Sequence, residues 1–217
     1  MMLDRFTWFW QSGYRWAGDG LTVYIDPVEL PGESDPADLI FITHAHFDHF
    51  RQEDLERLRT DDTQIVAPGD VAAELSGEVR AVAPGDSDEV KGVRFQAVPA
   101  YNNVEHRLQA HPKSNNWVGY VLELGGNTYY HAGDTDHLPE LEQVRTDVAF
   151  LPIGEGGFTM DGREAAGLAK VISPQIAVPM HYGFVEGCHG AGEAETFRRE
   201  AEPVKVEVLE PQVPFAF

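Results

Sequence analysis

The sequence predicts an α/β (mixed α+β) fold in which two β-sheets pack face to face between outer helices, a four-layer αββα sandwich. The chain has 217 residues, of which 42% are hydrophobic, and this is enough for one well-buried domain over residues 1–217. Short strand-like segments alternate along it with short helix-like segments. That alternation is typical of layered α/β folds.

We expect the N-terminal half of the chain to form the first half of the sandwich. Aromatic, β-prone residues and a turn at Ala17–Gly20 indicate paired strands between residues 5 and 26, where we expect the clustered Trp side chains to pack in the core. The other elements expected up to residue 100 are strands at 39–42, 64–67, 79–83 and 93–100, helices at 51–59 and 69–75, and an acidic turn at 85–89.

The C-terminal half begins with a polar, irregular loop at 101–116, which is long enough to be functional. A helix is expected at 161–172, because Asp161 and Glu164 have the spacing of a capping box and the apolar residues fall on one face. The remaining expected elements are a hairpin at 117–131, strands at 147–152, 175–179 and 204–209, and a helix at 194–200.

The strongest local signal is H-x-H-x-D-H, which begins at His44 and directly follows an apolar, strand-like run. The four potential ligands therefore lie where a strand leads into a helix. In extended backbone alternate side chains point the same way, so His44 and His46 can reach one cation together. As the chain bends, Asp48 and His49 can face a second cation. Imidazole and carboxylate ligands suit zinc or another borderline transition metal.

With this motif the chain resembles the metallo-β-lactamase superfamily, whose signature is H-x-H-x-D-H, and within it the lactonase-like branch of metal-dependent hydrolases. Four further segments occur in the family's order and cover most of the chain: Tyr129–Thr135, Leu151–Gly154, Phe158–Met160 and Pro179–Tyr182. The resemblance implies the αββα sandwich and an active site that holds two metal ions.

The resemblance also implies ligands outside the first motif. Asp134 is expected to bridge the two metals, a role that needs a carboxylate because both of its oxygens carry lone pairs. Asp136 is the competing candidate, but Gly133-Asp134 matches the family motif. His181, in Pro-Met-His-Tyr, matches the family's last ligand and is expected at the second metal.

The sequence leaves the third histidine of the first metal site open. Asn102 stands where related hydrolases carry a histidine. His111 is the favoured replacement, because its loop is long enough to fold back over the metals and Pro112 stiffens the backbone behind it. A weak oxygen ligand or substrate contact from Asn102, or no further protein ligand, are the alternatives. His106 is less favoured because charged residues flank it.

Four more residues are candidates for supporting roles. His131 is expected to orient a ligand or to contact the substrate. His189 and His137 are expected at the rim, as substrate contacts or as solvated loop residues. Cys188 is the single cysteine, which excludes an intrachain disulfide. We expect it to be an inert thiol, with metal ligation as the alternative.

Together these features predict a dinuclear metal-dependent hydrolase that uses a metal-bound hydroxide on a small-molecule lactone or phosphate ester. Asp48 and Asp134 are the expected catalytic residues, and Asp48 would also orient the nucleophile. The expected cofactors are two divalent ions, zinc first, with manganese, nickel or iron as alternatives. The rival functions are a small-molecule phosphodiesterase and a metal-binding protein without hydrolase activity, which Asn102 in place of a histidine permits. Redox chemistry at a di-iron site is disfavoured because His49 is intact.

The composition restricts partners and location. A net charge of −20, from 36 acidic and 16 basic residues, repels nucleic acid and indicates a halophilic protein whose charge is screened by molar salt. No apolar run reaches a membrane-spanning length and no signal-peptide pattern is present, so we expect a cytoplasmic location. The expected partner is a small-molecule substrate, without nucleic acid or membrane, and homo-oligomer formation stays open.

Overall fold

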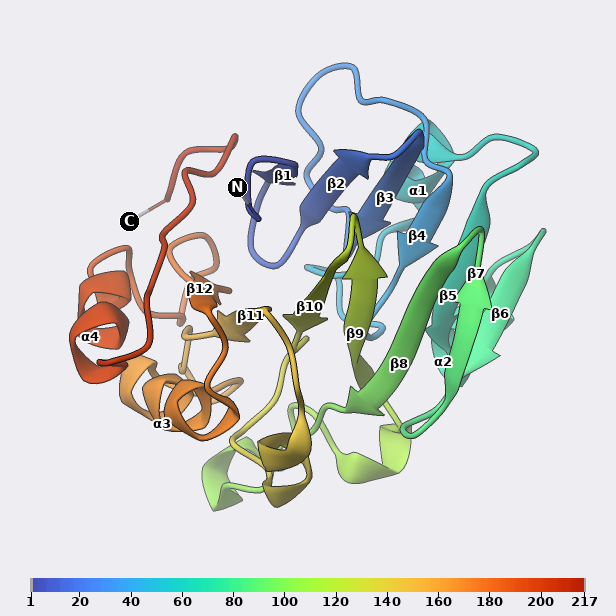
Figure 1. The fold of residues 1–217 in the computed structure, drawn as a ribbon. Coiled ribbons are helices and arrows are strands. Elements are labelled where there is room, and N and C mark those ends of the chain that lie inside the picture. Colours follow the sequence, from blue (N-terminus) through green and yellow to red (C-terminus); the bar gives the residue numbers. More distant parts are fainter. Residues whose placement is uncertain (1, 217) are drawn as a thin grey trace.

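The computed structural model describes residues 2–216 and contains two six-stranded sheets that pack face to face, with helices on both outer sides (Figure 1). One cluster of buried side chains fills the space between the sheets and continues under the C-terminal helices. A second, smaller cluster lies between the first sheet and its own helices. The predicted αββα sandwich is confirmed.

The first sheet comes from the N-terminal part of the chain. Its strands are, in spatial order, β1 (Phe6–Trp8), β2 (Tyr14–Gly18), β3 (Leu21–Ile25), β4 (Leu39–Phe41), β5 (Gln64–Pro68) and β6 (Val79–Val82). The first three pair antiparallel, and β3 to β6 pair parallel. Helices α1 (Gln52–Leu58) and α2 (Gly69–Glu74) cover the outer face.

Strand β4 shows why the run before the metal motif is apolar at every position. Leu39 and Phe41 belong to the core between the sheets. Ile40, on the opposite face, belongs to the cluster formed with Leu55 and Leu58 of α1. A parallel strand that is buried on both faces has no position for a polar side chain, so its sequence does not alternate.

The second sheet contains, in spatial order, β12 (Ile176–Met180), β11 (Val148–Pro152), β10 (Asn127–His131), β9 (Val118–Leu124), β8 (Val93–Pro99) and β7 (Ser87–Val90). Helices α3 (Gly162–Ile172) and α4 (Glu193–Glu200) pack beside β11 and β12 (Figure 1). Three short 3-10 turns are η1 (Glu105–Arg107), η2 (Lys113–Asn115) and η3 (Pro139–Gln143). The predicted capping box of α3 is confirmed, with reciprocal hydrogen bonds between Asp161 and Glu164.

Two expected elements are wrong. The acidic turn at 85–89 is largely strand, because Ser87–Val90 pairs with β8 and buries Val90, and this pairing overrides the low β-propensity of the acidic residues. The strand at 204–209 is reduced to an isolated bridge between Ala177 and Val206. In this segment the half-buried Val204, Val206 and Val208 pack against the core without forming a continuous ladder of strand hydrogen bonds.

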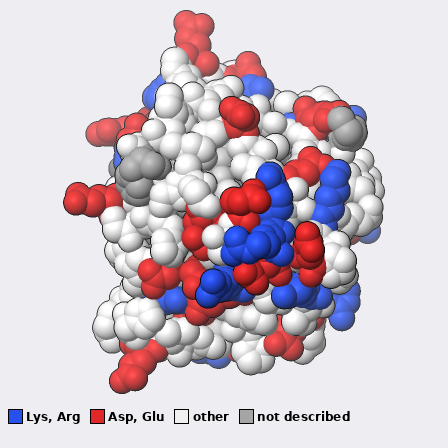
Figure 2. Space-filling view, turned by 90° about the vertical axis from the view of Figure 1, so that its left-hand side faces the viewer, with Lys and Arg blue, Asp and Glu red and all other residues white. Residues whose placement is uncertain are grey.

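Charge is distributed unevenly over the surface. On the face that Figure 2 shows, Lys and Arg side chains gather in one area among Asp and Glu side chains, and other acidic side chains stand alone at the edges. Within residues 2–216, no helix combines the length and hydrophobicity needed to cross a membrane. Because acidic charge is in excess, we expect the stability of the folded protein to depend on salt concentration.

The melting temperature is expected to rise by several degrees between about 0.1 M and about 2 M KCl. With 36 acidic against 16 basic residues, like charges repel across the surface, and the Debye length shrinks from about 10 Å to a few Å over this range. Differential scanning calorimetry in a KCl series at constant pH measures the effect. A profile that stays flat in KCl would contradict adaptation of this surface to high salt.

Candidate metal centre

Seven potential ligands converge at one edge of the sandwich, from segments far apart in the sequence. They are His44, His46, Asp48 and His49 after β4, His111 in the loop between β8 and β9, Asp134 after β10, and His181 after β12. The carboxyl ends of the parallel strands meet at this edge, as is usual for sites in α/β proteins. Two glycines shape this edge. Gly133, at φ +61°, allows the turn that leads into Asp134. Gly154 lies against the His181 backbone, where a Cβ would come within 2.2 Å of the carbonyl oxygen.

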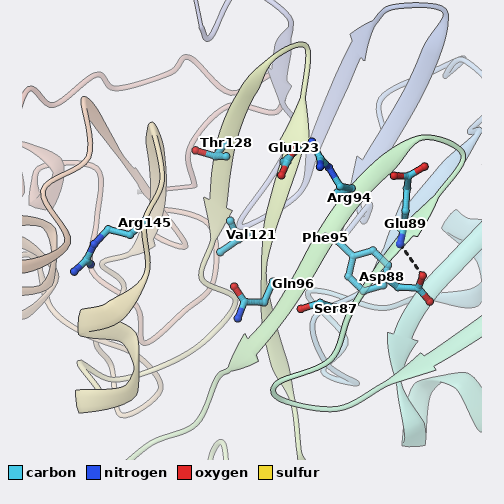
Figure 3. Close-up of a pocket in the computed structure, with 10 residues that line it drawn as sticks. All are labelled: Ser87, Asp88, Glu89, Arg94, Phe95, Gln96, Val121, Glu123, Thr128 and Arg145. Atoms are coloured by element: carbon cyan, nitrogen blue, oxygen red, sulfur yellow. Dashed lines mark hydrogen bonds and ion pairs between the residues drawn. The ribbon is translucent and has the colours of Figure 1, made fainter.

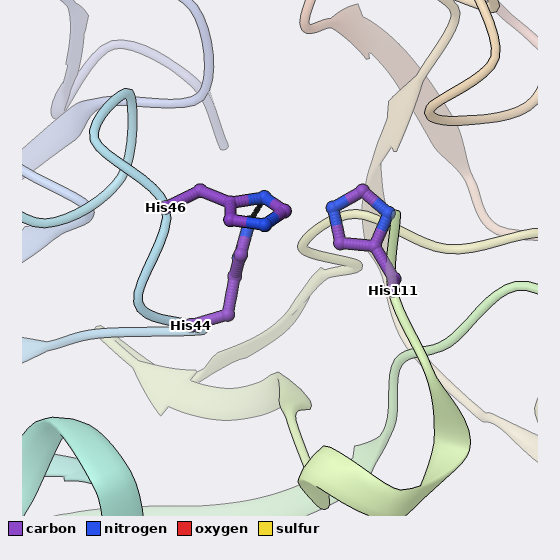
Figure 4. Close-up of side chains that lie close together, drawn as sticks. All are labelled: His44, His46 and His111. Atoms are coloured by element: carbon purple, nitrogen blue, oxygen red, sulfur yellow. Dashed lines mark hydrogen bonds between the residues drawn. The ribbon is translucent and has the colours of Figure 1, made fainter. Parts of the chain in front are cut away.

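The first group of ligand atoms is formed by three histidines, His44, His46 and His111 (Figure 4). His44 and His46 leave the loop after β4, and the His111 ring faces them from the opposite side. One nitrogen from each ring lies within 4.8 Å of the other two, and the His44 Nε2 to His46 Nδ1 distance is 3.2 Å. The loop at 101–116 therefore folds back over the motif and brings His111, not His106, to it.

The second group is formed by Asp48, His49 and His181, again with ligand atoms within 4.8 Å of one another. Asp48 Oδ2 lies 3.4 Å from His181 Nε2 and 3.9 Å from His49 Nε2. His49 and His181 are fully or almost fully buried, and Asp48 is 7% exposed. This group is the expected position of a second cation.

Asp134 lies between the two groups. Its Oδ2 is 3.3 Å from His111 Nε2 and 2.9 Å from His181 Nε2, while its Oδ1 is 3.3 Å from His49 Nε2. One carboxylate thus faces histidines of both groups, which is the arrangement that a bridging ligand needs. Asp136, the competing candidate, points elsewhere: it accepts hydrogen bonds from Arg107 and from the backbone of Asn103 and Val104.

The ligand atoms fit a metal because several of them have no other partner. The buried His49 Nε2, His111 Nε2 and Asp134 Oδ1 form no hydrogen bond with any of the described residues. Buried polar atoms normally have hydrogen-bond partners, so unpaired atoms that face one point require an explanation. Imidazoles and carboxylates are also the donors that zinc and similar cations prefer. The residues present therefore fit two divalent cations.

Asp26 is a supporting residue that the sequence did not reveal. Its carboxylate accepts hydrogen bonds from Thr43 N (2.8 Å), Thr43 Oγ1 (2.6 Å) and His49 Nδ1 (2.7 Å). Thr43 Oγ1 also lies 3.0 Å from His44 Nδ1. The second ring nitrogens of His44 and His49 are therefore held from behind, which directs the Nε2 atoms of both rings toward the site.

Asn102 has the same relation to His111. Its Oδ1 accepts a hydrogen bond from His111 Nδ1 at 2.8 Å, and its Nδ2 donates to the Phe158 carbonyl at 3.0 Å. The side chain is buried, and both ends of its amide are engaged. The structure thus places Asn102 behind His111, where it orients the ring, instead of at the cavity as the expected substrate contact.

The other predicted supporting residues belong to none of the ligand groups among the described residues. His131 is buried, and both of its ring nitrogens have backbone partners: one donates to the Ser12 carbonyl at 2.9 Å and the other accepts from Gly133 N. Its ring is therefore engaged with the backbone of the β1–β2 loop and of Gly133. His189 lies 4.0 Å from Glu155 and is not among the described residues that line the cavity, and His137 pairs with Glu142 at 3.2 Å. Cys188 is buried and lines the cavity, but no ligand group among the described residues includes it.

The electrostatics divide the histidines into two kinds. Burial lowers the pKa of His44 well below its usual value, and nearby His49 lowers it further. Burial, together with His111, also lowers the pKa of His46. Burial would lower the pKa of His49 as well, but the carboxylates around it, Asp134 first, raise the pKa to about 10. His44 and His46 are therefore neutral in the metal-free site, and His49 carries a proton.

The carboxylates carry the matching negative charge. Burial alone would raise the pKa of Asp134, but His181 and His49 lower it well below its usual range. Burial would also raise the pKa of Asp48, but His49 and His181 together outweigh it and lower the pKa below its usual range. The pKa of His181 is raised by Asp134 despite burial. Metal binding at the second group must therefore displace protons from two imidazoles.

The metal-free protein is expected to lose thermal stability as pH rises from about 6.5 to about 10. Because the pKa of His49 rises from 6.5 to about 10 on folding, its proton stabilises the folded state fully below pH 6.5 and progressively less up to pH 10. A decrease of several degrees is expected, since 1 kcal/mol corresponds to roughly 2–4 °C at this size. Calorimetry of chelator-treated protein tests this. The metal-loaded protein is the control and should lack the decline, because ligation needs neutral imidazole.

A cavity of about 170 Å³ opens beside the ligands. Its lining consists of four potential ligands, His46, Asp48, Asp134 and His181, and of four other side chains, Phe47, Phe158, Val185 and Cys188, which we call the apolar wall. Phe47 and Phe158 are 61% and 39% exposed, which is unusual for large apolar side chains. No Lys or Arg lines the cavity within the part of the chain that the structure describes. The cavity therefore combines a metal-binding floor with an apolar wall.

A larger hollow, of about 480 Å³, lies on the open face of β7 to β10 (Figure 3). It shares no residue with the ligand groups. Among its charged side chains, Arg94 pairs with Glu123 at 2.5 Å and Asp88 pairs with Arg80. We therefore assign the chemistry to the smaller cavity.

Known proteins are similar to this chain in sequence and in fold. A sequence model of the Beta-lactamase superfamily domain matches residues 5–181. A UPF0173 metal-dependent hydrolase of Methanopyrus kandleri is 32% identical over 228 aligned residues, which cover 95% of this chain and 97% of that protein. A crystal structure of a Parabacteroides distasonis protein has a TM-score of 0.85 at 30% identity and covers 95% of this chain and 93% of its own. Igni18, a metallo hydrolase of Ignicoccus hospitalis, has a TM-score of 0.77 at 25% identity, with coverage of 95% and 94%. With a family match over most of its length and relatives of this kind, the chain belongs to the beta-lactamase superfamily, among its metal-dependent hydrolases.

Proposed function

We propose that this protein is a dinuclear metal-dependent hydrolase that acts on a small, uncharged carbonyl compound such as a lactone. The observation that carries the proposal is the position of Asp134, whose carboxylate faces His111 on one side and His49 and His181 on the other. Two ligand groups joined by one carboxylate support a centre with two ions. Zinc is the first candidate for both positions, because imidazole dominates the donor set.

The chain's own residues would hold the ions and shape the space beside them. His44, His46 and His111 would hold the first ion, and Asp48, His49 and His181 the second, with Asp134 between them. When bound, such ions lower the pKa of water to near neutrality and polarise a substrate oxygen. Asp48 also lines the cavity, so its carboxylate can accept a hydrogen bond from a water molecule or substrate group there.

The apolar wall supports an uncharged substrate over a phosphate ester. Phe47, Phe158 and Val185 can bury an alkyl group and keep bulk water from the centre. Phosphate sites normally present Arg, Lys or backbone N–H groups to the anion, and the described lining contains no Arg or Lys. The net charge of −20 also disfavours anionic substrates and nucleic acid. A phosphodiesterase activity is therefore the second candidate.

A substrate panel tests the proposal. Metal-stripped protein would be reloaded with zinc, manganese or nickel and assayed at low and at molar salt against lactones, carboxylic esters and a generic phosphodiester. We expect hydrolysis of a lactone or ester, with activity that reaches its maximum near two metal equivalents. Activity on the phosphodiester alone would reverse the order of the candidates. Two tightly bound ions without hydrolysis of any compound would favour a metal-binding protein that has lost catalysis.

A further inference from the structure

Gln11 is a buried residue of the β1–β2 loop that reaches the centre although no sequence motif marks it. Its side chain and backbone are 0% exposed. The loop is closed by hydrogen bonds from Phe9 N to Gly13 O (2.8 Å) and from Gly13 N to Trp10 O (2.7 Å), which place Gln11 at the tip. Its φ is +47°, a conformation that a non-glycine residue adopts only when the surroundings hold it there.

The backbone of Gln11 is fastened directly to a ligand. Its carbonyl oxygen accepts hydrogen bonds from Trp8 Nε1 at 2.9 Å and from His181 N at 3.1 Å. His181 also has a positive φ, of +60°. Two strained non-glycine residues thus meet through one hydrogen bond, beside the second ligand group. Strain of this kind is concentrated at functional sites.

The side chain of Gln11 contacts the same ligand group. Its Nε2 lies 3.2 Å from Asp48 Oδ2 and 3.2 Å from His181 Nε2. The amide oxygen, Oε1, is buried and has no hydrogen-bond partner among the described residues. A residue retained only for packing would be better apolar here, because a buried amide with an unpaired oxygen disfavours folding. The contacts to two ligand atoms explain why an amide stands at this position.

We propose that Gln11 is a positioning residue of the second metal position. Its amide N–H donates to Asp48 Oδ2 and fixes the carboxylate beside His181, while its backbone carbonyl fixes the His181 main chain. The two ligands come from loops 133 residues apart in sequence, and the Gln11 side chain contacts both. Outer partners of this kind set the direction and affinity of metal ligands.

This inference rests on the proposed two-metal function, and its test measures metal binding instead of turnover. Metal-stripped full-length protein would be titrated with Co²⁺ and followed by visible absorption. The wild type is expected to take up two equivalents. In Gln11→Ala one equivalent should bind as in the wild type, and the other about 10- to 100-fold more weakly. Gln11→Glu should behave like Gln11→Ala, because a carboxylate repels Asp48 instead of donating to it.

Ser12→Ala is the matched control in the same loop. Ser12 is equally buried, and its hydroxyl has no hydrogen-bond partner among the described residues, so the variant should bind both ions as the wild type does. Unchanged binding in Gln11→Ala, tight binding of both ions in Gln11→Glu, or an equal loss at both positions would each overturn the positioning role. A wild type that takes up a single ion would instead contradict the two-metal function itself.

Discussion

Asp134→Ala is expected to bind neither metal ion tightly and to lose almost all hydrolytic activity. The carboxylate lies 2.9 Å from His181, 3.3 Å from His111 and 3.3 Å from His49, so its removal takes a ligand from both positions at once. A metal centre provides several kcal/mol of transition-state stabilisation, and a loss of about 4 kcal/mol corresponds to roughly a thousandfold in rate. Metal content after reconstitution and kcat/KM on the best panel substrate measure the two effects.

Asp134→Asn is the shape-matched companion. It keeps the volume and one oxygen but removes the charge that raises the pKa values of His181 and His49. We expect weakened binding of both ions and an activity between those of the wild type and the alanine variant. Because the asparagine fills the same space, a loss in both variants cannot be attributed to a cavity. Metal content that stays at the wild-type level in Asp134→Ala would remove the bridging assignment.

The alternation of elements and the ligand motif were readable from the sequence because both depend on local pattern. The apolar run at β4 reflects burial on both faces, and each apolar residue there has its place in one of two clusters. The capping box at Asp161 and Glu164 is a contact between residues three positions apart. The superfamily, the sandwich and the hydrolase class were therefore predictable, and the structural and sequence comparisons confirm them.

The supporting residues were not readable because their contacts join distant parts of the chain. Gln11 and His181 are 170 residues apart, and Asp26 and His49 are 23 apart. Nothing in Trp-Gln-Ser-Gly marks Gln11 as a buried polar side chain. A signal was present only for Asp26, which directly follows β3 at the edge where ligands converge.

The two wrong secondary-structure predictions, at 85–89 and 204–209, have a related cause. Edge strand β7 is specified by its partner β8, and its own sequence, Ser-Asp-Glu-Val, reads as a turn. The final valines alternate as a strand would, but β12 offers them only one bridge. Pairing at a sheet edge depends on the available neighbour more than on propensity.

The second large effect is expected at the first metal position, where His111→Ala should lower metal affinity by about tenfold or more. His111 Nε2 is buried, lacks a hydrogen-bond partner among the described residues and lies 3.3 Å from Asp134 Oδ2. Its other nitrogen is held by Asn102, so the ring is already oriented. Without it, His44, His46 and Asp134 remain, which leaves a weaker site. Competition with a chelator during zinc titration measures the change.

His106→Ala is the control for this prediction, because His106 comes from the same loop but is exposed, lies 3.6 Å from Glu155 and belongs to none of the ligand groups among the described residues. It should bind both ions as the wild type does. Asn102→Ala should fall between the two variants, since it leaves the His111 ring in place and removes the acceptor that orients it. Equal behaviour of His111→Ala and His106→Ala would show that His111 is not a ligand. A stronger effect of Asn102→Ala than of His111→Ala would instead make Asn102 the group that completes the first position.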